Sequence, residues 1–131
     1  MRQRRRGFRV FMDERRILRV SETVREELSE IIGFEMEDPR LLEVDVTDVQ
    51  VSPDSRHAVV KVALRGDQKQ QNQALDALAH ASGYLRRELA LRLQLRQVPE
   101  LHFEQDKNPN VESRIEFLLR RVRKSRGRDE N

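Results

Sequence analysis

The chain contains no cysteine, which excludes disulfide bonds and metal sites built from thiolates. It has no apolar run of the roughly 18 residues that a membrane-spanning helix needs. The first residues lack the apolar segment of a secretory signal. Residues 1–12 hold five arginines and no acid, as a transit peptide would, but they lack serine, and Asp13 and Glu14 follow directly. We therefore expect a cytoplasmic protein with no membrane partner, and the length fits one domain.

The common signatures of catalysis are also missing. The sequence shows no nucleophile elbow, no Walker glycine loop and no GxGxxG fingerprint. His57, His80 and His102 fall on a predicted strand, a predicted helix and a predicted strand, without the close spacing of metal ligands. We interpret them as structural or solvated side chains.

Three carboxylates remain as candidates for metal chemistry. Asp45, Asp48 and Asp106 lie near the ends of predicted strands and could cluster as in a metal-dependent nuclease. Their spacing fits surface charge equally well. The sequence therefore predicts a protein that is not an enzyme and holds no metal and no cofactor.

Charge is distributed unevenly along the chain, whose formal net charge is +3. Residues 1–20 hold eight arginines and two acids, and residues 120–131 hold six basic and two acidic residues. The stretch between them holds 12 basic and 19 acidic residues. Basic arms of this kind bind nucleic acid through charge, although solvated tails that aid solubility show the same pattern. We expect a flexible basic arm at 1–12, a folded domain at 13–122 and a basic tail at 123–131.

Hydrophobic periodicity predicts a first helix that begins after Asp13, a plausible N-cap. This helix should end by Glu37, because Pro39 biases the residue before it away from helical angles. Residues 38–41 then form a turn.

Two strands follow, at 44–51 and 58–64, joined in a hairpin by a turn at 52–55. The apolar positions of the first strand change from even to odd numbers near Thr47 and Asp48. A one-residue shift moves every side chain to the other face, so the pattern indicates a β-bulge there.

The centre of the sequence is residues 74–95, where leucine and alanine recur at helical spacing. Residues 66–73, polar and rich in glutamine, are interpreted as the loop before it. Gly83 lies among small residues, so we predict two helices that meet at a kink there, with a positive φ or packing that leaves no room for a Cβ. Free N–H groups at the start of the second helix would favour a phosphate. The alternative is a weakened core helix with solvated arginines.

A short strand at 101–104 and a last helix after Asn108 complete the element order α-β-β-α-α-β-α. The apolar stripe of the last helix consists of Val111, Ile115, Leu118, Leu119 and Val122. A three-stranded sheet with helices on one side would bury every predicted stripe. The fold class is therefore a two-layer α+β domain.

This order, with a sharp junction between two helices, resembles a type II KH domain, in which a GxxG loop usually clamps the nucleic-acid backbone. Here the junction is Ala81-Ser82-Gly83, and the chain is similar over residues 16–122 to the ribosome-binding factor A family, whose variant KH fold has an Ala-x-Gly kink. The other matching motifs include Asp38-Pro39-Arg40-Leu41, Val46-Thr47-Asp48-Val49, Gly83-Tyr84-Leu85-Arg86 and Pro99-x-Leu101-x-Phe103.

The resemblance implies a monomeric, non-catalytic factor that binds the small ribosomal subunit and its rRNA. Such factors assist late maturation and processing of that rRNA and matter most in the cold, and a ribosome-assembly GTPase is a candidate further partner. One tyrosine and five phenylalanines leave few rings for base stacking, so affinity should come from phosphate contacts. The residues expected to contact RNA are Arg4, Arg5, Arg6, Arg40, Ala81, Ser82, Gly83, Arg86, Arg87, Arg96, Arg123 and Lys124. The alternative is a KH-like adaptor that binds protein partners through its acidic face.

Overall fold

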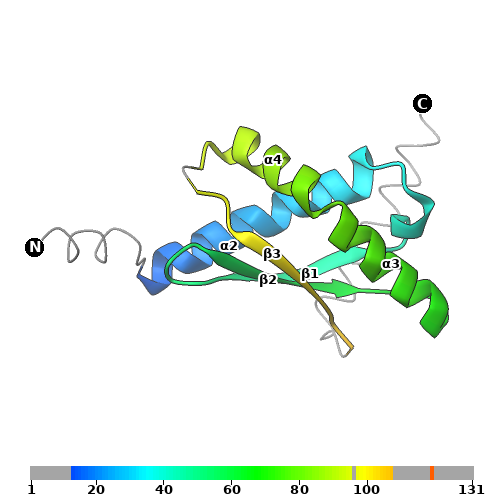
Figure 1. The fold of residues 1–131 in the computed structure, drawn as a ribbon. Coiled ribbons are helices and arrows are strands. Elements are labelled where there is room, and N and C mark those ends of the chain that lie inside the picture. The colour runs from blue at the N-terminus through cyan, green and yellow to red at the C-terminus, as the bar shows by residue number, and fades with distance from the viewer. Residues whose placement is uncertain (1–12, 96, 108–118, 120–131) are drawn as a thin grey trace, which may run out of the picture.

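Helices pack on one face of a three-stranded sheet to form two layers (Figure 1). The computed structural model describes residues 13–95, 97–107 and 119. The elements in chain order are α2 (Glu14–Glu30), the π-helical turn η1 (Ile31–Glu35), the 3₁₀ turn η2 (Pro39–Leu41), β1 (Asp45–Val51), β2 (His57–Ala63), α3 (Gln68–His80), α4 (Ser82–Leu93) and β3 (Glu100–Gln105). The predicted two-layer α+β class is confirmed.

Helix α2 begins and ends where the sequence predicts. The carboxylate of Asp13 accepts a hydrogen bond from the backbone N–H of Arg16 at 2.8 Å, so the predicted N-cap is confirmed. The helix buries Val24 and Leu28 and widens into the π-helical turn η1. That turn ends at Glu35, before Pro39 starts the 3₁₀ turn η2.

Strand β2 lies at the centre of the sheet, antiparallel to β1 and parallel to β3. The register between β1 and β2 shifts between Val46 and Asp48, which confirms the predicted bulge. Thr47 lies at the bulge, and its hydroxyl donates to the carboxylate of Asp106 at 2.7 Å. This hydrogen bond ties β1 to the end of β3 across the central strand.

The prediction of a loop over residues 66–73 is wrong, because α3 begins at Gln68. Asp67 and Gln70 form a capping box in which each side chain accepts from the other's backbone N–H at 2.8 Å. Gly66 precedes the cap and has φ +93°, a backbone conformation that is strained for any residue with a side chain.

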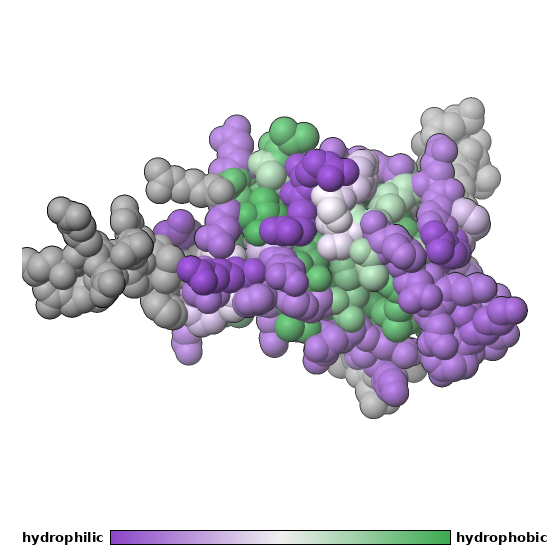
Figure 2. Space-filling model, viewed as in Figure 1, coloured by the Kyte–Doolittle hydropathy of each residue, from purple (hydrophilic) through white to green (hydrophobic). Residues whose placement is uncertain are grey.

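The core lies between the sheet and the helices. Val60 and Val62 of the central strand are fully buried, as are Leu78 of α3 and Leu85 and Leu89 of α4. Hydrophilic side chains cover most of the face shown in Figure 2, with hydrophobic patches between them. The large hydrophobic side chains that stay exposed include Leu18, Phe34 and Leu91.

Several predictions concern parts of the chain outside the described residues. These are the arm at 1–12, the tail at 123–131 and the last helix, of which Leu119 alone is described, with 54% of its surface exposed. Among the helices of the described part, no segment has the length and apolar character that would let it cross a membrane.

Candidate nucleic-acid interface

The predicted break between two helices exists, and it falls at Ala81. The N–H of Ala81 closes α3 on the carbonyl of Ala77 at 3.0 Å, and its own carbonyl accepts the first bond of α4 from Leu85 at 2.9 Å. Ala81 has φ −83° and ψ −3° and separates the two helices. Helices α3 and α4 follow one another along the same side of the molecule in Figure 1.

Because of this break, a second helix begins at Ser82. Ser82, Gly83 and Tyr84 form the first turn of α4, where N–H groups have no acceptor within their own helix, and no side chain caps α4. Gly83 and Tyr84 are exposed. The first turn of α4 therefore presents N–H groups and the positive end of a helix dipole to solvent.

The expected backbone constraint at Gly83 is wrong. Gly83 has no positive φ, and a Cβ built on it would meet only the guanidinium of Arg87, at 3.5 Å, which is an ordinary contact. The physical reason is that Ala81 makes the turn, so Gly83 already lies inside α4 on its exposed side.

Arg86 and Arg87 are adjacent residues of α4, but their side chains have different environments. The guanidinium of Arg87 lies over Gly83, in the first turn of α4, and its side chain is exposed. The guanidinium of Arg86 donates to the carbonyl of Val98 at 3.0 Å, while its Nε is buried without a hydrogen-bond partner. Arg87 can contact a phosphate at the junction, whereas Arg86 holds the segment between α4 and β3 against α4.

Arg40 is also engaged by a neighbouring residue. Its guanidinium forms an ion pair with Asp38 at 2.7 Å, and Nε donates to both carboxylate oxygens of Asp38. These hydrogen bonds, with the backbone N–H of Arg40, hold the pKa of the Asp38 carboxyl below its usual value. Arg40 therefore carries a partly neutralised charge into any RNA contact.

An arginine that the sequence analysis did not select binds three acids. Arg92 of α4 contacts Glu27 of α2 at 3.7 Å, Glu88 of its own helix at 3.4 Å, and Glu35 of η1. The hydrogen bond that the Arg92 guanidinium donates to the Glu35 carboxylate raises the pKa of Arg92 above its ordinary value. This cluster joins α4 to α2, and only tertiary structure could reveal it.

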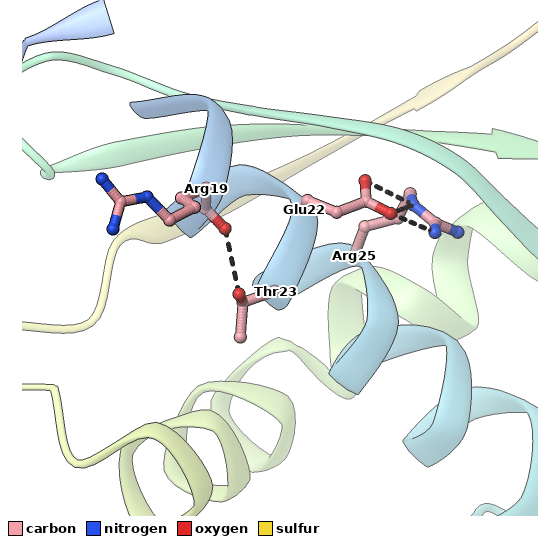
Figure 3. A network of polar contacts seen from close by, with 4 residues as sticks. All are labelled: Arg19, Glu22, Thr23 and Arg25. Atoms are coloured by element: carbon pink, nitrogen blue, oxygen red, sulfur yellow. Dashed lines mark hydrogen bonds and ion pairs between the residues drawn. The ribbon is translucent and has the colours of Figure 1, made fainter. Parts of the chain in front are cut away.

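A further basic surface lies between α2 and the end of α4. An open groove of about 560 Å³ is lined by Arg16, Arg19, Val20, Thr23, Leu93 and Leu95. In Figure 3 the guanidinium of Arg19 extends away from α2, while Arg25 of the same helix pairs with Glu22. Among residues 13–95, 97–107 and 119, neither Arg16 nor Arg19 has an acidic partner. Sequence reasoning missed these two arginines. The available signal was their place in the exposed first turns of α2, before its first buried position.

The remaining predicted contacts, Arg4, Arg5, Arg6, Arg96, Arg123 and Lys124, lie outside the described residues. Ala81 and Ser82 are half-buried at the junction. The structure thus brings Ala81, Ser82, Gly83 and Arg87 together and directs Arg86 elsewhere.

The histidine and carboxylate candidates also need revision. His57 and His102 are not separate: Nδ1 of His57 lies 3.1 Å from Nε2 of His102, because β2 and β3 are neighbours. Glu100 joins them as the one group of possible metal ligands found in the described residues. Asp45, Asp48 and Asp106 form no such group there, so the nuclease alternative gains no support from the geometry.

Comparison with known proteins gives consistent results. The sequence model of the family described as ribosome-binding factor A matches residues 16–119. A protein of Solibacter usitatus (strain Ellin6076) named ribosome-binding factor A is 74% identical over 120 residues, which is 92% of this chain and 98% of the relative. The fold is similar to the crystal structure of ribosome-binding factor A from Thermus thermophilus, with TM-score 0.61 and 30% identity over 68% of this chain and 94% of that one. It is also similar to a homology model of the Thermus thermophilus factor fitted into a cryo-EM map of a 30S complex, with TM-score 0.54 and 33% identity over 64% and 88% of the two chains.

Proposed function

The chain belongs to the ribosome-binding factor A family, and on this premise we propose that it binds the small ribosomal subunit and its rRNA. A relative of the same fold has been fitted into a map of a 30S complex, which supports this partner. The observation in this chain that carries the proposal is the helix junction. There Arg87, which has no acidic partner among the described residues, lies beside the N–H groups of the first turn of α4, an arrangement suited to a phosphate.

The second basic surface extends this contact. Arg16 and Arg19 lie at the far end of α4 from the junction, beside Leu93. A helix of 12 residues is about 18 Å long. An RNA backbone that follows α4 would therefore meet basic side chains at both ends of the helix.

This binding is non-catalytic and needs no cofactor. Phosphate contacts fix the position of a protein on RNA but carry little sequence information, so the shape of the rRNA selects the site. Membership of the family supports a finer proposal: the protein acts as a cytoplasmic monomer, assists late processing of small-subunit rRNA and matters most in the cold. A ribosome-assembly GTPase is the further partner that we propose.

Co-sedimentation with purified small subunits tests the proposal. We expect the full chain to sediment with the subunit, and Arg87→Glu to abolish this association without changing the melting temperature. Lys69→Glu is the matched control, since Lys69 is exposed in the first turn of α3 and the change alters the charge equally. Full association of the Arg87→Glu variant would contradict the assigned interface. Binding to basic peptides without binding to the subunit would favour the protein adaptor instead.

A further inference from the structure

The ends of β2 and β3 carry a cluster of side chains that the proposed RNA contacts do not use. His57 pairs in register with Glu100, and Val59 with His102, in the parallel ladder of these strands. Side chains alternate between the faces of a sheet, so His57, Glu100 and His102 share one face. Their neighbours Ala58 and Leu101 point into the core on the other face. The cluster therefore lies on the side of the sheet opposite the helices.

The spacing of the cluster matches the requirements of a small divalent metal ion. The two imidazole nitrogens are 3.1 Å apart, and one ligand atom from each of the three residues lies within 4.8 Å of the others. Two nitrogens bound at about 2.0–2.1 Å in tetrahedral geometry would be about 3.3–3.4 Å apart. The histidines need almost no movement to reach that geometry, and rotation of the Glu100 side chain brings in the carboxylate.

The backbone that carries these ligands is held in place. The N–H of His57 donates to the Ser52 hydroxyl at 3.1 Å, and the N–H of Ser52 donates to the carbonyl of His57 at 2.8 Å. The N–H of Glu100 donates to the carbonyl of Arg56 at 2.8 Å. Ligands on the paired ends of two strands are already arranged for binding, which lowers the entropic cost of forming a site.

We propose that His57, His102 and Glu100 form a binding site for a divalent transition metal of the zinc class. Imidazole nitrogens favour Zn²⁺, Ni²⁺ or Co²⁺ over Mg²⁺ and Ca²⁺, which prefer oxygen ligands. Three protein ligands leave a fourth position open for water. The bound ion links the edge strand β3 to β2, so its effect is to stabilise the sheet, independently of whether the protein binds RNA.

A calorimetric titration of the untagged full chain with Zn²⁺ alone tests this site. The chain has three histidines and no cysteine, so competing sites are few. We expect one Zn²⁺ per chain, and we expect His57→Gln or His102→Gln to weaken binding by about tenfold or more. His80→Gln is the matched control, because His80 lies at the end of α3 and outside the cluster. Mg²⁺ should not compete.

A second measurement does not depend on the variants. In NMR spectra of the wild-type chain, Zn²⁺ should shift the imidazole ring signals of His57 and His102 and leave those of His80 unchanged. A bound ion should also raise the melting temperature of the wild-type chain. Zn²⁺ binding that is equally strong in the His57→Gln/His102→Gln variant, or ring shifts confined to His80, would overturn the proposal. The absence of any Zn²⁺ binding would do so too.

Discussion

At the scale of single residues, arginines of this protein differ in whether a neighbour already holds the guanidinium. Arg92 binds three carboxylates and Arg86 donates to the Val98 carbonyl, whereas Arg87 has no acidic partner in the described part of the chain. Adjacent residues on a helix point about 100° apart, so Arg86 and Arg87 face different surroundings. No sequence pattern shows which of the two faces the segment before β3.

The difference between these two arginines leads to a prediction for paired variants. Arg86→Ala removes a charged donor from the Val98 carbonyl and should lower the free energy of unfolding by about 1–3 kcal/mol. Arg87→Ala should leave that free energy within about 0.5 kcal/mol of wild type. Urea unfolding of the two variants makes the comparison. Equal losses would show that Arg86 does not brace the segment before β3.

Gly83 gives a second prediction at this scale. The structure leaves ordinary space for a Cβ, and alanine is the better helix former. Gly83→Ala should therefore raise the free energy of unfolding by up to about 1 kcal/mol, as thermal melts would show. Gly66→Ala is the contrasting variant, because Gly66 has φ +93° and a Cβ there would meet the Gln70 side chain. It should destabilise the protein, and a loss of stability in the Gly83 variant would contradict the geometry described for α4.

At the scale of elements, local patterns in the sequence predicted most of the structure. The apolar stripe of α2, the hairpin and the bulge near Thr47 all follow from periodicity, which reports which face of an element is buried. The start of α3 was missed, since its exposed first turns are glutamine-rich and polar. The capping box of Asp67 and Gln70 was the available signal.

The capping box predicts a measurable loss. Asp67→Ala removes the acceptor for the Gln70 N–H and should lower the free energy of unfolding by about 1 kcal/mol. Asp67→Asn keeps a good N-cap and should stay close to wild type. Chemical unfolding followed by circular dichroism compares the two. If both variants lose the same stability, the cap is not what stabilises α3.

The turn between β1 and β2 predicts a dependence on pH. Hydrogen bonds from the Ser52 hydroxyl and the Arg56 N–H hold the pKa of Asp54 below its ordinary value of 3.8. A carboxyl with a lowered pKa stabilises the fold above that ordinary value and loses the effect as the pH falls through its folded-state pKa. Asp54→Asn should therefore be less stable than wild type at pH 7, and the difference should shrink in acid. Unfolding curves from pH 7 downward would show a constant difference if Asp54 plays no such part.

At the scale of the whole molecule, the contacts that join distant segments could not be predicted. His57 and His102 are 45 positions apart and meet only because β3 pairs in parallel with β2. The sequence shows that a third strand exists but not which strand it joins or in which direction. The groove between α2 and α4 depends in the same way on how the helices pack.

The basic arm gives the prediction for the whole chain. If residues 1–12 contact phosphates, their deletion should weaken RNA binding and make it less dependent on salt. The slope of the logarithm of the binding constant against the logarithm of the salt concentration should fall in magnitude by about 0.7–0.9 per lost contact. A chain of full length with the five arginines of this arm replaced by glutamine should behave like the deletion, because the effect depends on charge. Binding measured from low to high salt tests both. An unchanged slope would mean that the arm is a solvated tail.

The central position of β2 has a consequence for how the chain folds as it is synthesised. Strand β3 reaches β2 only after α3 and α4 have been made, so the hairpin of β1 and β2 must wait with one edge of β2 unpaired. An unpaired strand edge is a template for association with other chains. Closing this long connection also carries an entropic cost before the parallel ladder forms. We expect docking of β3 to limit the folding rate, and the nascent chain to be most prone to aggregation just before that step.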